Sequence, residues 1–194
     1  TVTGGEPFIR KDFVEIIDNI IKSSGVPRVS INSNGFYKDR IQNFIPQLIK
    51  KNKDTEFTLS ISLDGPEEIH DKVRAFKGAY KKALETIDVI KSYREKPNFF
   101  LKLASVLTKD NKSYMENFLN ETSTWPIDFH ELILVRDVPV KEQLEVKKEY
   151  EKLSKIQHKR TSSLWKKSFN GKLFEKLYLE TIKRIDSDKV YSPC

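Results

Sequence analysis

The apolar residues of the chain recur with two different spacings along residues 1–136. Spacings of three and four residues, which place side chains on one face of a helix, predict helices at about 11–24, 41–49, 80–90 and 111–122. Short apolar stretches bounded by turn signals predict strands at 1–3, 29–32, 57–63, 99–106 and 127–135. At the start of the first helix, Asp12 and Glu15 have the spacing of a capping box.

The stretch 57–63 shows the clearest strand pattern. Its odd-numbered positions are apolar: Phe57, Leu59, Ile61 and Leu63. The even-numbered positions that alternate with them are small and polar: Thr58, Ser60, Ser62 and, directly after the strand, Asp64. Successive side chains of a strand point to opposite faces of its sheet. We therefore expect one face to pack under helices and the other to line a space that holds a ligand.

The strands recur about every 30–40 residues with a helix between them, which is typical of consecutive βαβ units. Such units build a parallel sheet with right-handed crossovers, and the sheet becomes either an open doubly wound layer or a barrel. The sequence thus predicts an α/β fold. In both arrangements ligands bind where the strands end at their carboxyl side.

Polar residues and glycines follow each predicted strand at that side. They are Gly4-Gly5-Glu6, Asn34, Ser62 with Asp64, Thr108 and Arg136. Two glycines let the backbone approach a ligand closely, and the carboxylate of Glu6 is a natural acceptor for an ammonium group. The alternative for this segment is an ordinary turn between strand and helix with Glu6 on the surface. The convergence of polar groups at one edge favours a binding site.

The pattern changes after Pro139. Residues 141–160 predict a highly charged helix whose core candidates are Leu144, Leu153 and Ile156, and residues 164–185 predict a more apolar helix. We expect residues 1–138 to form the α/β core and residues 139–190 a helical appendage that links the core to residues 191–194.

The composition restricts the classes of function. The net charge is +7, but Lys and Arg are interleaved with Glu and Asp along the predicted helices, which is typical of solvated helix faces. No zinc-finger, RRM or KH pattern supports a nucleic-acid partner, and no apolar run is long enough for a membrane span. The single cysteine, Cys194, excludes an internal disulfide, and a reducing, cytoplasmic location is expected.

Three motifs in this order resemble the radical S-adenosylmethionine (radical SAM) enzymes that carry a cysteine-rich SPASM or twitch extension. They are GGEPFIRKDFVEII from residue 4, VSINSNGF from residue 29, and SISLDGPEEIHDKVRAFKGAYKKALETI from residue 60. The resemblance implies a partial (β/α)₆ TIM-like barrel that contains strands two to six and lacks strand one. It also implies an enzyme that generates a 5′-deoxyadenosyl radical from S-adenosylmethionine and abstracts a hydrogen atom from its substrate.

The resemblance assigns cofactor-binding roles to several positions. Gly4, Gly5 and Glu6 match the segment that binds the amino end of S-adenosylmethionine. Asn34 matches a residue at the barrel mouth, with a plain turn residue as the alternative. Ser62 and Asp64 match positions that reach the ribose and methionine parts; the alternative for both is capping of the strand end at Gly65-Pro66.

Three more positions complete the expected cofactor site. Arg74 is expected to bind the cofactor carboxylate, or alternatively to pair with Asp71 or Glu67. Val106 and Val135 match strand ends that pack near the adenine, and core packing is the alternative for both.

The histidines have other expected roles. His70 is expected to form a loop ion pair with Asp71. His130 is expected to be a satisfied histidine inside the barrel, and His158 to be solvated.

The CxxxCxxC motif that holds the catalytic 4Fe–4S cluster in this family is absent, and we expect it upstream of Thr1. The segment ending in Pro193-Cys194 resembles the start of the extension, where Cys194 would be a ligand of an auxiliary iron–sulfur cluster; an incidental thiol is the alternative. The resemblance favours a peptide or protein as substrate, with a small molecule left open, and a reductant such as flavodoxin or ferredoxin.

Two other functions compete with this hypothesis. The first is a noncatalytic α/β domain that binds a nucleotide-like ligand or a partner protein. The second is a basic RNA-binding accessory domain.

Overall fold

The computed structural model describes residues 1–136 and 138–161. Strands and helices alternate as the sequence predicts. The strands are β1 (Arg28–Ser33), β2 (Glu56–Ser62), β3 (Phe99–Leu107) and β4 (Phe129–Leu134). The α-helices are α1 (Phe13–Ser24), α2 (Lys38–Lys51), α3 (Glu67–Val73), α4 (Ala79–Ile90), α5 (Lys112–Thr122) and α6 (Val140–Thr161), with short 3-10 helices η1 (Pro7–Ile9) and η2 (Lys91–Glu95).

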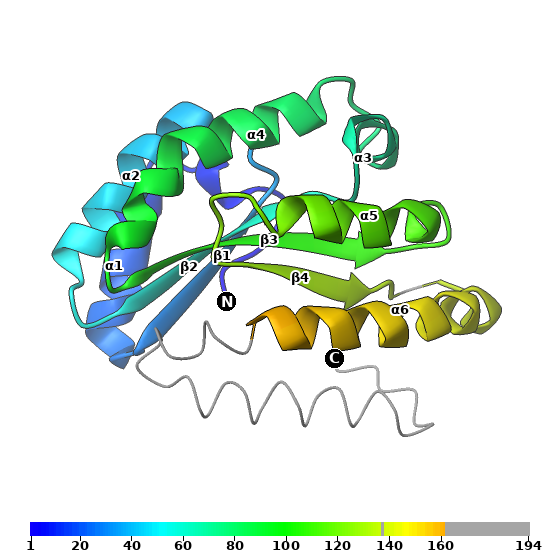
Figure 1. Ribbon diagram of the computed structural model, residues 1–194. Helices are drawn as coiled ribbons and strands as arrows, with labels where there is room; N and C mark the ends of the chain where they lie inside the picture. Colours follow the sequence, from blue (N-terminus) through cyan, green and yellow to red (C-terminus); the bar gives the residue numbers. More distant parts are fainter. Residues whose placement is uncertain (137, 162–194) are drawn as a thin grey trace.

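The strands form one parallel sheet in the order β1-β2-β3-β4, and all of them point to the same side of the molecule (Figure 1). Upstream of β1, Val2 forms a parallel bridge with Ile31, so the predicted first strand is a single pairing at the edge of the sheet. The open sheet agrees with the predicted α/β fold and with part of a (β/α)₆ barrel. Its carboxyl edge is where the sequence places the candidate site.

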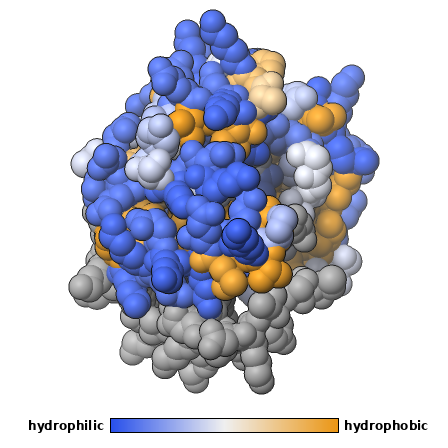
Figure 2. All heavy atoms as spheres, turned by 90° about the vertical axis from the view of Figure 1, so that its right-hand side faces the viewer, coloured by the Kyte–Doolittle hydropathy of each residue, from blue (hydrophilic) through white to orange (hydrophobic). Residues whose placement is uncertain are grey.

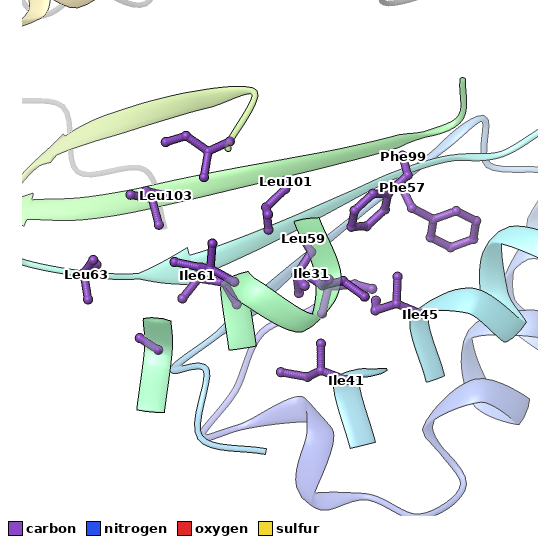
Figure 3. Close-up of a cluster of buried hydrophobic side chains, with 14 of the residues drawn as sticks. Ile31, Ile41, Ile45, Phe57, Leu59, Ile61, Leu63, Phe99, Leu101 and Leu103 are labelled. Atoms are coloured by element: carbon purple, nitrogen blue, oxygen red, sulfur yellow. The ribbon is translucent and has the colours of Figure 1, made fainter. Parts of the chain in front are cut away.

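The core lies between this sheet and its helices. The register pairs Leu59 with Ile31 on one side and with Leu101 on the other, so all three side chains share one face. Figure 3 shows this face packed against Ile41 and Ile45 of α2, and both isoleucines are fully buried. The alternation predicted for residues 57–63 is therefore confirmed for the apolar face.

Two local predictions about helix starts and loops are wrong. Asp12 precedes α1 but makes no side-chain cap; its carboxylate instead pairs with Arg10, with Oδ2 at 2.6 Å from Nη2. The segment after Gly65, for which the sequence predicts no helix, contains the helix α3. The apolar stripe of α3 is too short to reveal a helix by periodicity.

Of the core candidates predicted for α6, Leu153 is fully buried and Ile156 packs partly buried against the core, whereas Leu144 does not join it. Leu144 is 55% exposed, whereas Val146, Tyr150 and Leu153 are buried in the common core. These three residues have the spacing of one helical face, and Leu144 lies on another. Through this face α6 packs on β4 and on α5 (Figure 1).

Two further observations bear on the expected organisation. No helix within the described residues is both long and apolar enough to span a membrane. The predicted helix 164–185 and Cys194 lie outside the described residues, so the division at residues 138 and 190 stays a prediction.

Candidate functional site

The Gly4-Gly5-Glu6-Pro7 turn is attached to the end of β1 by the side chain of Glu6. This carboxylate is 8% exposed. Its Oε1 accepts hydrogen bonds from the backbone N–H of Phe8 at 3.2 Å and from the hydroxyl of Ser33 at 3.0 Å, and its Oε2 accepts from the N–H of Asn34 at 2.7 Å. Glu6 is therefore a buried anchor that joins two strand ends, and the surface position considered from the sequence is wrong.

The two glycines of this turn have room around them. Gly4 has φ 138°, and a Cβ atom placed on either Gly4 or Gly5 would meet no atom within 4 Å. Both glycines are exposed. A ligand can thus approach this backbone closely, as the sequence predicts for the segment.

The turn after β1 combines a local hydrogen bond with tight packing. Asn34 Oδ1 accepts from the N–H of Phe36 at 2.9 Å, which closes an Asx turn. Gly35 follows with φ 76°, and its carbonyl accepts from the hydroxyl of Thr86 at 2.6 Å. A Cβ at Gly35 would lie 3.1 Å from Cα of Ala83, so this glycine sets how closely α4 approaches the sheet.

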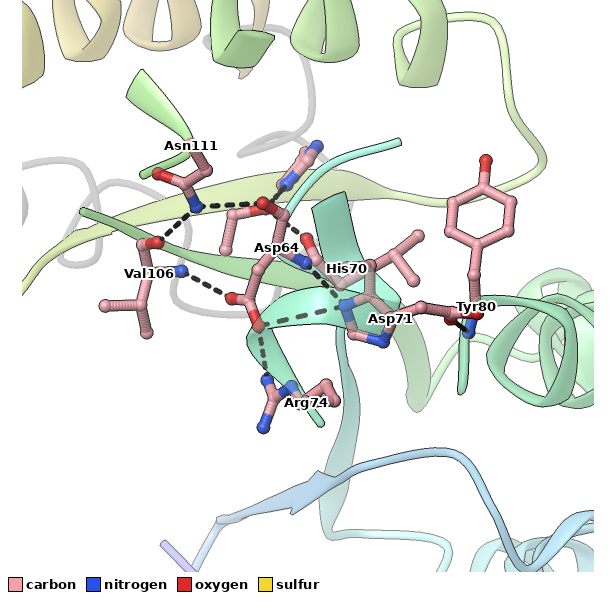
Figure 4. A network of polar contacts seen from close by, with 10 residues as sticks. Asp64, His70, Asp71, Arg74, Tyr80, Val106 and Asn111 are labelled. Carbon is pink, nitrogen blue, oxygen red and sulfur yellow. Dashed lines mark hydrogen bonds and ion pairs between the residues drawn. The ribbon is translucent and has the colours of Figure 1, made fainter. Parts of the chain in front are cut away.

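Asp64 is the centre of a polar network at the carboxyl end of β2 (Figure 4). The residue is 2% exposed. Its Oδ1 accepts from the N–H of Val106 at 2.9 Å, and its Oδ2 lies 2.8 Å from Nη2 of Arg74. The structure thus brings together three predicted site residues. Arg74 pairs with neither Asp71 nor Glu67, the alternatives considered from the sequence.

Arg74 has hydrogen-bonding capacity beyond this ion pair. Its side chain is 32% exposed, and its Nε is buried without a hydrogen-bond partner among the described residues. A guanidinium presents five N–H donors in a fixed planar arrangement, which suits a carboxylate. The free donors make Arg74 the residue of this edge best suited to bind an anionic group.

His70 does not form the expected ion pair with Asp71. Its Nδ1 accepts a hydrogen bond from the backbone N–H of Asp64 at 3.0 Å, and the ring is 1% exposed. Burial lowers the pKa of His70 to about 4, against an opposing effect of the Asp64 carboxylate, so the ring is neutral. His70 therefore fixes the backbone of Asp64.

Asp71 has a separate role at the start of α4. Its carboxylate accepts from the backbone N–H of Gly78 at 2.5 Å and of Tyr80 at 2.9 Å. These hydrogen bonds lower the pKa of Asp71. His70 thus holds the backbone of Asp64, whereas its neighbour Asp71 holds the start of α4.

Asn111 is a site residue that the sequence does not reveal. It is fully buried, and its Nδ2 donates to the carbonyls of Asp64 and Val106, both at 2.8 Å, while its Oδ1 accepts from the N–H of Thr108 at 2.8 Å. The sequence shows only an Asn at the start of a predicted helix. Its position next to Asp64 depends on the pairing of β2 with β3.

The remaining predicted residues lie along the same edge. Ser62 is half-buried and makes no side-chain hydrogen bond within the described residues. Val106 is half-buried, and Val135 is 8% exposed with its N–H bonded to the carbonyl of Leu107 at 3.1 Å. Arg136 is exposed just beyond β4. The face to which the strands point is mostly hydrophilic, with separate apolar patches (Figure 2).

His130 has the expected character of a satisfied histidine. Its Nε2 lies 2.6 Å from the hydroxyl of Ser105, and its Nδ1 lies 2.8 Å from the hydroxyl of Thr122. Burial lowers the pKa of His130 to about 3, so the ring is neutral at physiological pH. The side chain of His158 lies outside the described part.

The edge is suited to hold an organic ligand with polar ends. It offers open backbone at Gly4 and Gly5, a guanidinium at Arg74 and a hydroxyl at Ser62. Within the described residues, no group of three or more His, Cys, Asp or Glu side chains is arranged to hold a metal ion. These residues therefore do not provide a site for an iron–sulfur cluster.

Comparison with known proteins identifies the family. The sequence profile of the Radical SAM superfamily matches residues 1–121. The chain belongs to this superfamily. The segment that matches includes the Glu6 turn, the Asn34 turn and the Asp64 network.

Curated relatives share about a third of the residues. Molybdenum cofactor biosynthesis protein moc-5 of Caenorhabditis elegans is 31% identical over 129 residues, which are 66% of this chain and 20% of moc-5. A probable GTP 3′,8-cyclase of Sulfolobus acidocaldarius is 31% identical over 138 residues, 71% of this chain and 41% of the relative. The sporulation killing factor maturation protein SkfB of Bacillus subtilis is 32% identical over 88 residues, 45% of this chain and 20% of SkfB. The chain thus spans less than half of these relatives.

A solved structure supports the fold. The protein anSMEcpe with bound AdoMet matches 84% of this chain and 44% of its own chain, with a TM-score of 0.56 and 18% sequence identity. The predicted α/β fold is therefore confirmed.

Proposed function

We propose that this chain is the S-adenosylmethionine-binding core of a radical SAM enzyme. The observation that carries the proposal is the ion pair of buried Asp64 with partly exposed Arg74 at the carboxyl end of β2, beside the Glu6 anchor at the end of β1. Parallel α/β sheets bind their ligands at this edge. When bound, S-adenosylmethionine supplies the 5′-deoxyadenosyl group that abstracts a hydrogen atom from the substrate.

Arg74 is proposed to bind the carboxylate of the cofactor. Asp64 holds one Nη of its guanidinium at 2.8 Å, which orients the remaining donors before the ligand arrives. The Arg74 side chain is 32% exposed, so part of it is accessible to a ligand.

The turn at residues 4–6 is proposed to bind the ammonium group. The Glu6 carboxylate already accepts hydrogen bonds from three donors, so one of its roughly four lone-pair sites remains. We therefore assign most of the contact to the backbone of Gly4 and Gly5, which is open to a ligand. Glu6 contributes negative charge and holds these glycines in place.

Ser62 and Asp64 are proposed to lie next to the polar ribose and methionine parts, and Asn34 to lie at the mouth of the site. Val106 and Val135 are proposed to pack near the adenine. Their half-buried or buried positions at the ends of β3 and β4 support this assignment.

The iron–sulfur chemistry of the family has no ligands in the described residues. We keep the proposal that cysteines upstream of Thr1 bind the catalytic cluster, and that Cys194 contributes to an auxiliary cluster. We further propose flavodoxin or ferredoxin as the reductant.

The experiment that tests the proposal uses the full-length protein, reconstituted with iron and sulfide. Incubation with S-adenosylmethionine and dithionite is expected to yield 5′-deoxyadenosine and methionine, measured by mass spectrometry. Asp64→Asn should reduce the rate at least tenfold, because Arg74 loses its charged partner. Asp88→Asn, at an exposed position of α4, is the matched control. If the wild type binds S-adenosylmethionine without cleaving it, or binds none, the noncatalytic alternative is favoured.

The isolated chain gives a second test. Because a cluster supplies anchors for the cofactor in this family, we expect residues 1–194 alone to bind S-adenosylmethionine weakly or not at all. Micromolar binding in isothermal titration calorimetry would contradict this expectation.

For the substrate we propose a peptide or protein. The relationship to SkfB, a maturation protein, supports this class. The match to a probable GTP 3′,8-cyclase covers 71% of this chain, against 45% for SkfB, and supports a nucleotide as the second candidate. Turnover with substrate deuterated at exchange-stable carbon positions would distinguish them, since only the true substrate transfers deuterium into 5′-deoxyadenosine.

A further inference from the structure

A chain of buried hydrogen bonds leads from α5 to the backbone next to Asp64. Thr122 on α5 contacts Nδ1 of His130 at 2.8 Å, and Nε2 of His130 contacts the hydroxyl of Ser105 at 2.6 Å. The Ser105 hydroxyl in turn donates to the carbonyl of Leu63. All three polar residues are at most 5% exposed.

This series of hydrogen bonds compensates for an interruption in the backbone hydrogen bonding between β2 and β3. The N–H of Leu63 donates to the carbonyl of Ala104 at 2.9 Å, so the parallel register places the N–H of Val106 opposite the carbonyl of Leu63 as the next rung. That N–H donates instead to the Asp64 carboxylate at 2.9 Å. The Leu63 carbonyl consequently needs another donor, and Ser105 provides it.

This requirement fixes the direction of the hydrogen bonds. Since the single Ser105 proton goes to Leu63, Ser105 must accept from Nε2–H of His130. Nδ1 of His130 then accepts from Thr122. In the reverse direction, Thr122 would donate to the carbonyl of Phe118 or Leu119, and the Leu63 carbonyl would lose its donor.

We propose that His130 is a positioning residue for Asp64, acting through Ser105 on the peptide group between Leu63 and Asp64. His70 holds the N–H of Asp64, and Asn111 holds its carbonyl. Ser105 holds the carbonyl of Leu63. The N–H of Asp64, its carbonyl and the carbonyl before it therefore all have a hydrogen-bond partner. The Asp64 carboxylate then keeps the N–H of Val106 and the guanidinium of Arg74 together.

His130 also connects this site to the outer helices. Gln157 of α6 donates to the His130 carbonyl at 3.0 Å, and Thr122 of α5 contacts the ring. The packing of α5 and α6 against β4 thereby determines where the ring lies. The Asp64 carboxylate at the end of β2 is thus positioned by α5 and α6, the helices that follow β3 and β4.

The test compares four variants of the full-length protein. Gln places its amide nitrogen near the Nε2 position of His, so His130→Gln retains the donor to Ser105. Asn places its amide near Nδ1, so His130→Asn loses that donor. Ser105→Ala removes the link itself. Thr122→Val removes the hydroxyl that contacts Nδ1 and lies near the carbonyls of Phe118 and Leu119, but it leaves the Ser105–His130 contact in place. It therefore measures the loss of stability that occurs without loss of the Ser105 link.

The first readout is hydrogen–deuterium exchange of peptides covering residues 103–108, without cofactor, normalised to peptides covering residues 28–33. Ser105→Ala and His130→Asn are expected to accelerate exchange about tenfold in the first set, and His130→Gln and Thr122→Val less than about threefold. Equal exchange in Ser105→Ala and Thr122→Val, or in His130→Asn and His130→Gln, would overturn the proposal.

The second readout rests on the proposed function. The Kd for S-adenosylmethionine is expected to rise about tenfold in Ser105→Ala and His130→Asn and to stay near the wild-type value in His130→Gln. If the wild type binds no S-adenosylmethionine, the proposed function fails, while the exchange measurement still decides the positioning role. If Kd follows only the global unfolding free energy across the four variants, the positioning role is refuted.

Discussion

Replacing Glu6 by Gln tests whether this side chain is a structural anchor as well as part of a binding site. The substitution keeps the size of the side chain and removes one acceptor atom. If the new NH₂ faces Asn34, two donors meet where Oε2 now accepts at 2.7 Å. If it faces Phe8, the longer bond of 3.2 Å is lost, and the Ser33 hydroxyl must reorient. In either orientation one buried backbone N–H has no acceptor.

An unsatisfied buried donor costs about 1–3 kcal/mol, and replacing charge-assisted bonds by neutral ones adds to this cost. We therefore expect Glu6→Gln to lower the free energy of unfolding by about 2–3 kcal/mol. Urea unfolding of the full-length protein measures this value, with the slope m unchanged if the unfolded state is unaffected. The matched control is Glu15→Gln on the exposed face of α1, for which we expect a change below about 0.5 kcal/mol.

A loss of less than about 0.5 kcal/mol in Glu6→Gln would refute the reasoning, because it would mean that water or a shifted backbone satisfies the donors. A full loss of cofactor affinity with unchanged stability would point in the same direction. Glu6 would then act only on the ligand.

Three further outcomes follow from the same edge of the sheet. Arg74→Lys keeps the charge beside Asp64 but loses the planar donor arrangement, so we expect less than about 1 kcal/mol of lost stability and at least a tenfold higher Kd for S-adenosylmethionine; an unchanged Kd would show that Arg74 does not bind the ligand. Gly35→Ala should cost about 2–4 kcal/mol in urea unfolding, because it combines φ 76° with a Cβ 3.1 Å from Cα of Ala83. Gly25→Ala, with φ 62° and open space, should cost about 1 kcal/mol, and equal losses would contradict the packing argument. The pKa of His70 is lowered to about 4 from 6.5, so the unfolded state binds more protons between these pH values and stability falls as the pH falls through this range. The slope of unfolding free energy against pH reports how many more protons the unfolded state binds than the folded state. His70→Gln should reduce this difference by about one proton in this pH range, and an unchanged slope would show that His70 is not buried as a neutral ring.

The residues around Asp64 show why part of the site was predictable and part was not. Asp64 follows a strand with clean alternation, and Glu6 follows two glycines, so both carry a local signal of a strand end. Asn111 and Ser105 carry no such signal. Asn111 reads as a residue at the start of a helix and Ser105 as one polar position in a strand, and only the pairing of β2 with β3 brings them to the Asp64 backbone.

His70 makes the same point. The expected partner of His70 was its neighbour in sequence, Asp71, because short-range pairing is all that a sequence displays. In the structure the ring turns to the N–H of Asp64, six residues earlier, and Asp71 caps α4. A single polar residue fits several local partners equally well, and the choice between them depends on which donors burial leaves unsatisfied.

The sequence by itself determined the alternation of strands and helices, the apolar face of β2 and the edge at which polar groups collect. These features follow from periodicity and turn chemistry, which are local properties of the chain. The tertiary structure alone decided that Glu6 is a buried anchor, that Arg74 pairs with Asp64 and that Val146 rather than Leu144 joins the core. Those outcomes require the register between strands and the packing of helices, because each hydrogen-bond partner comes from a segment distant in sequence or from a loop whose course only the fold determines.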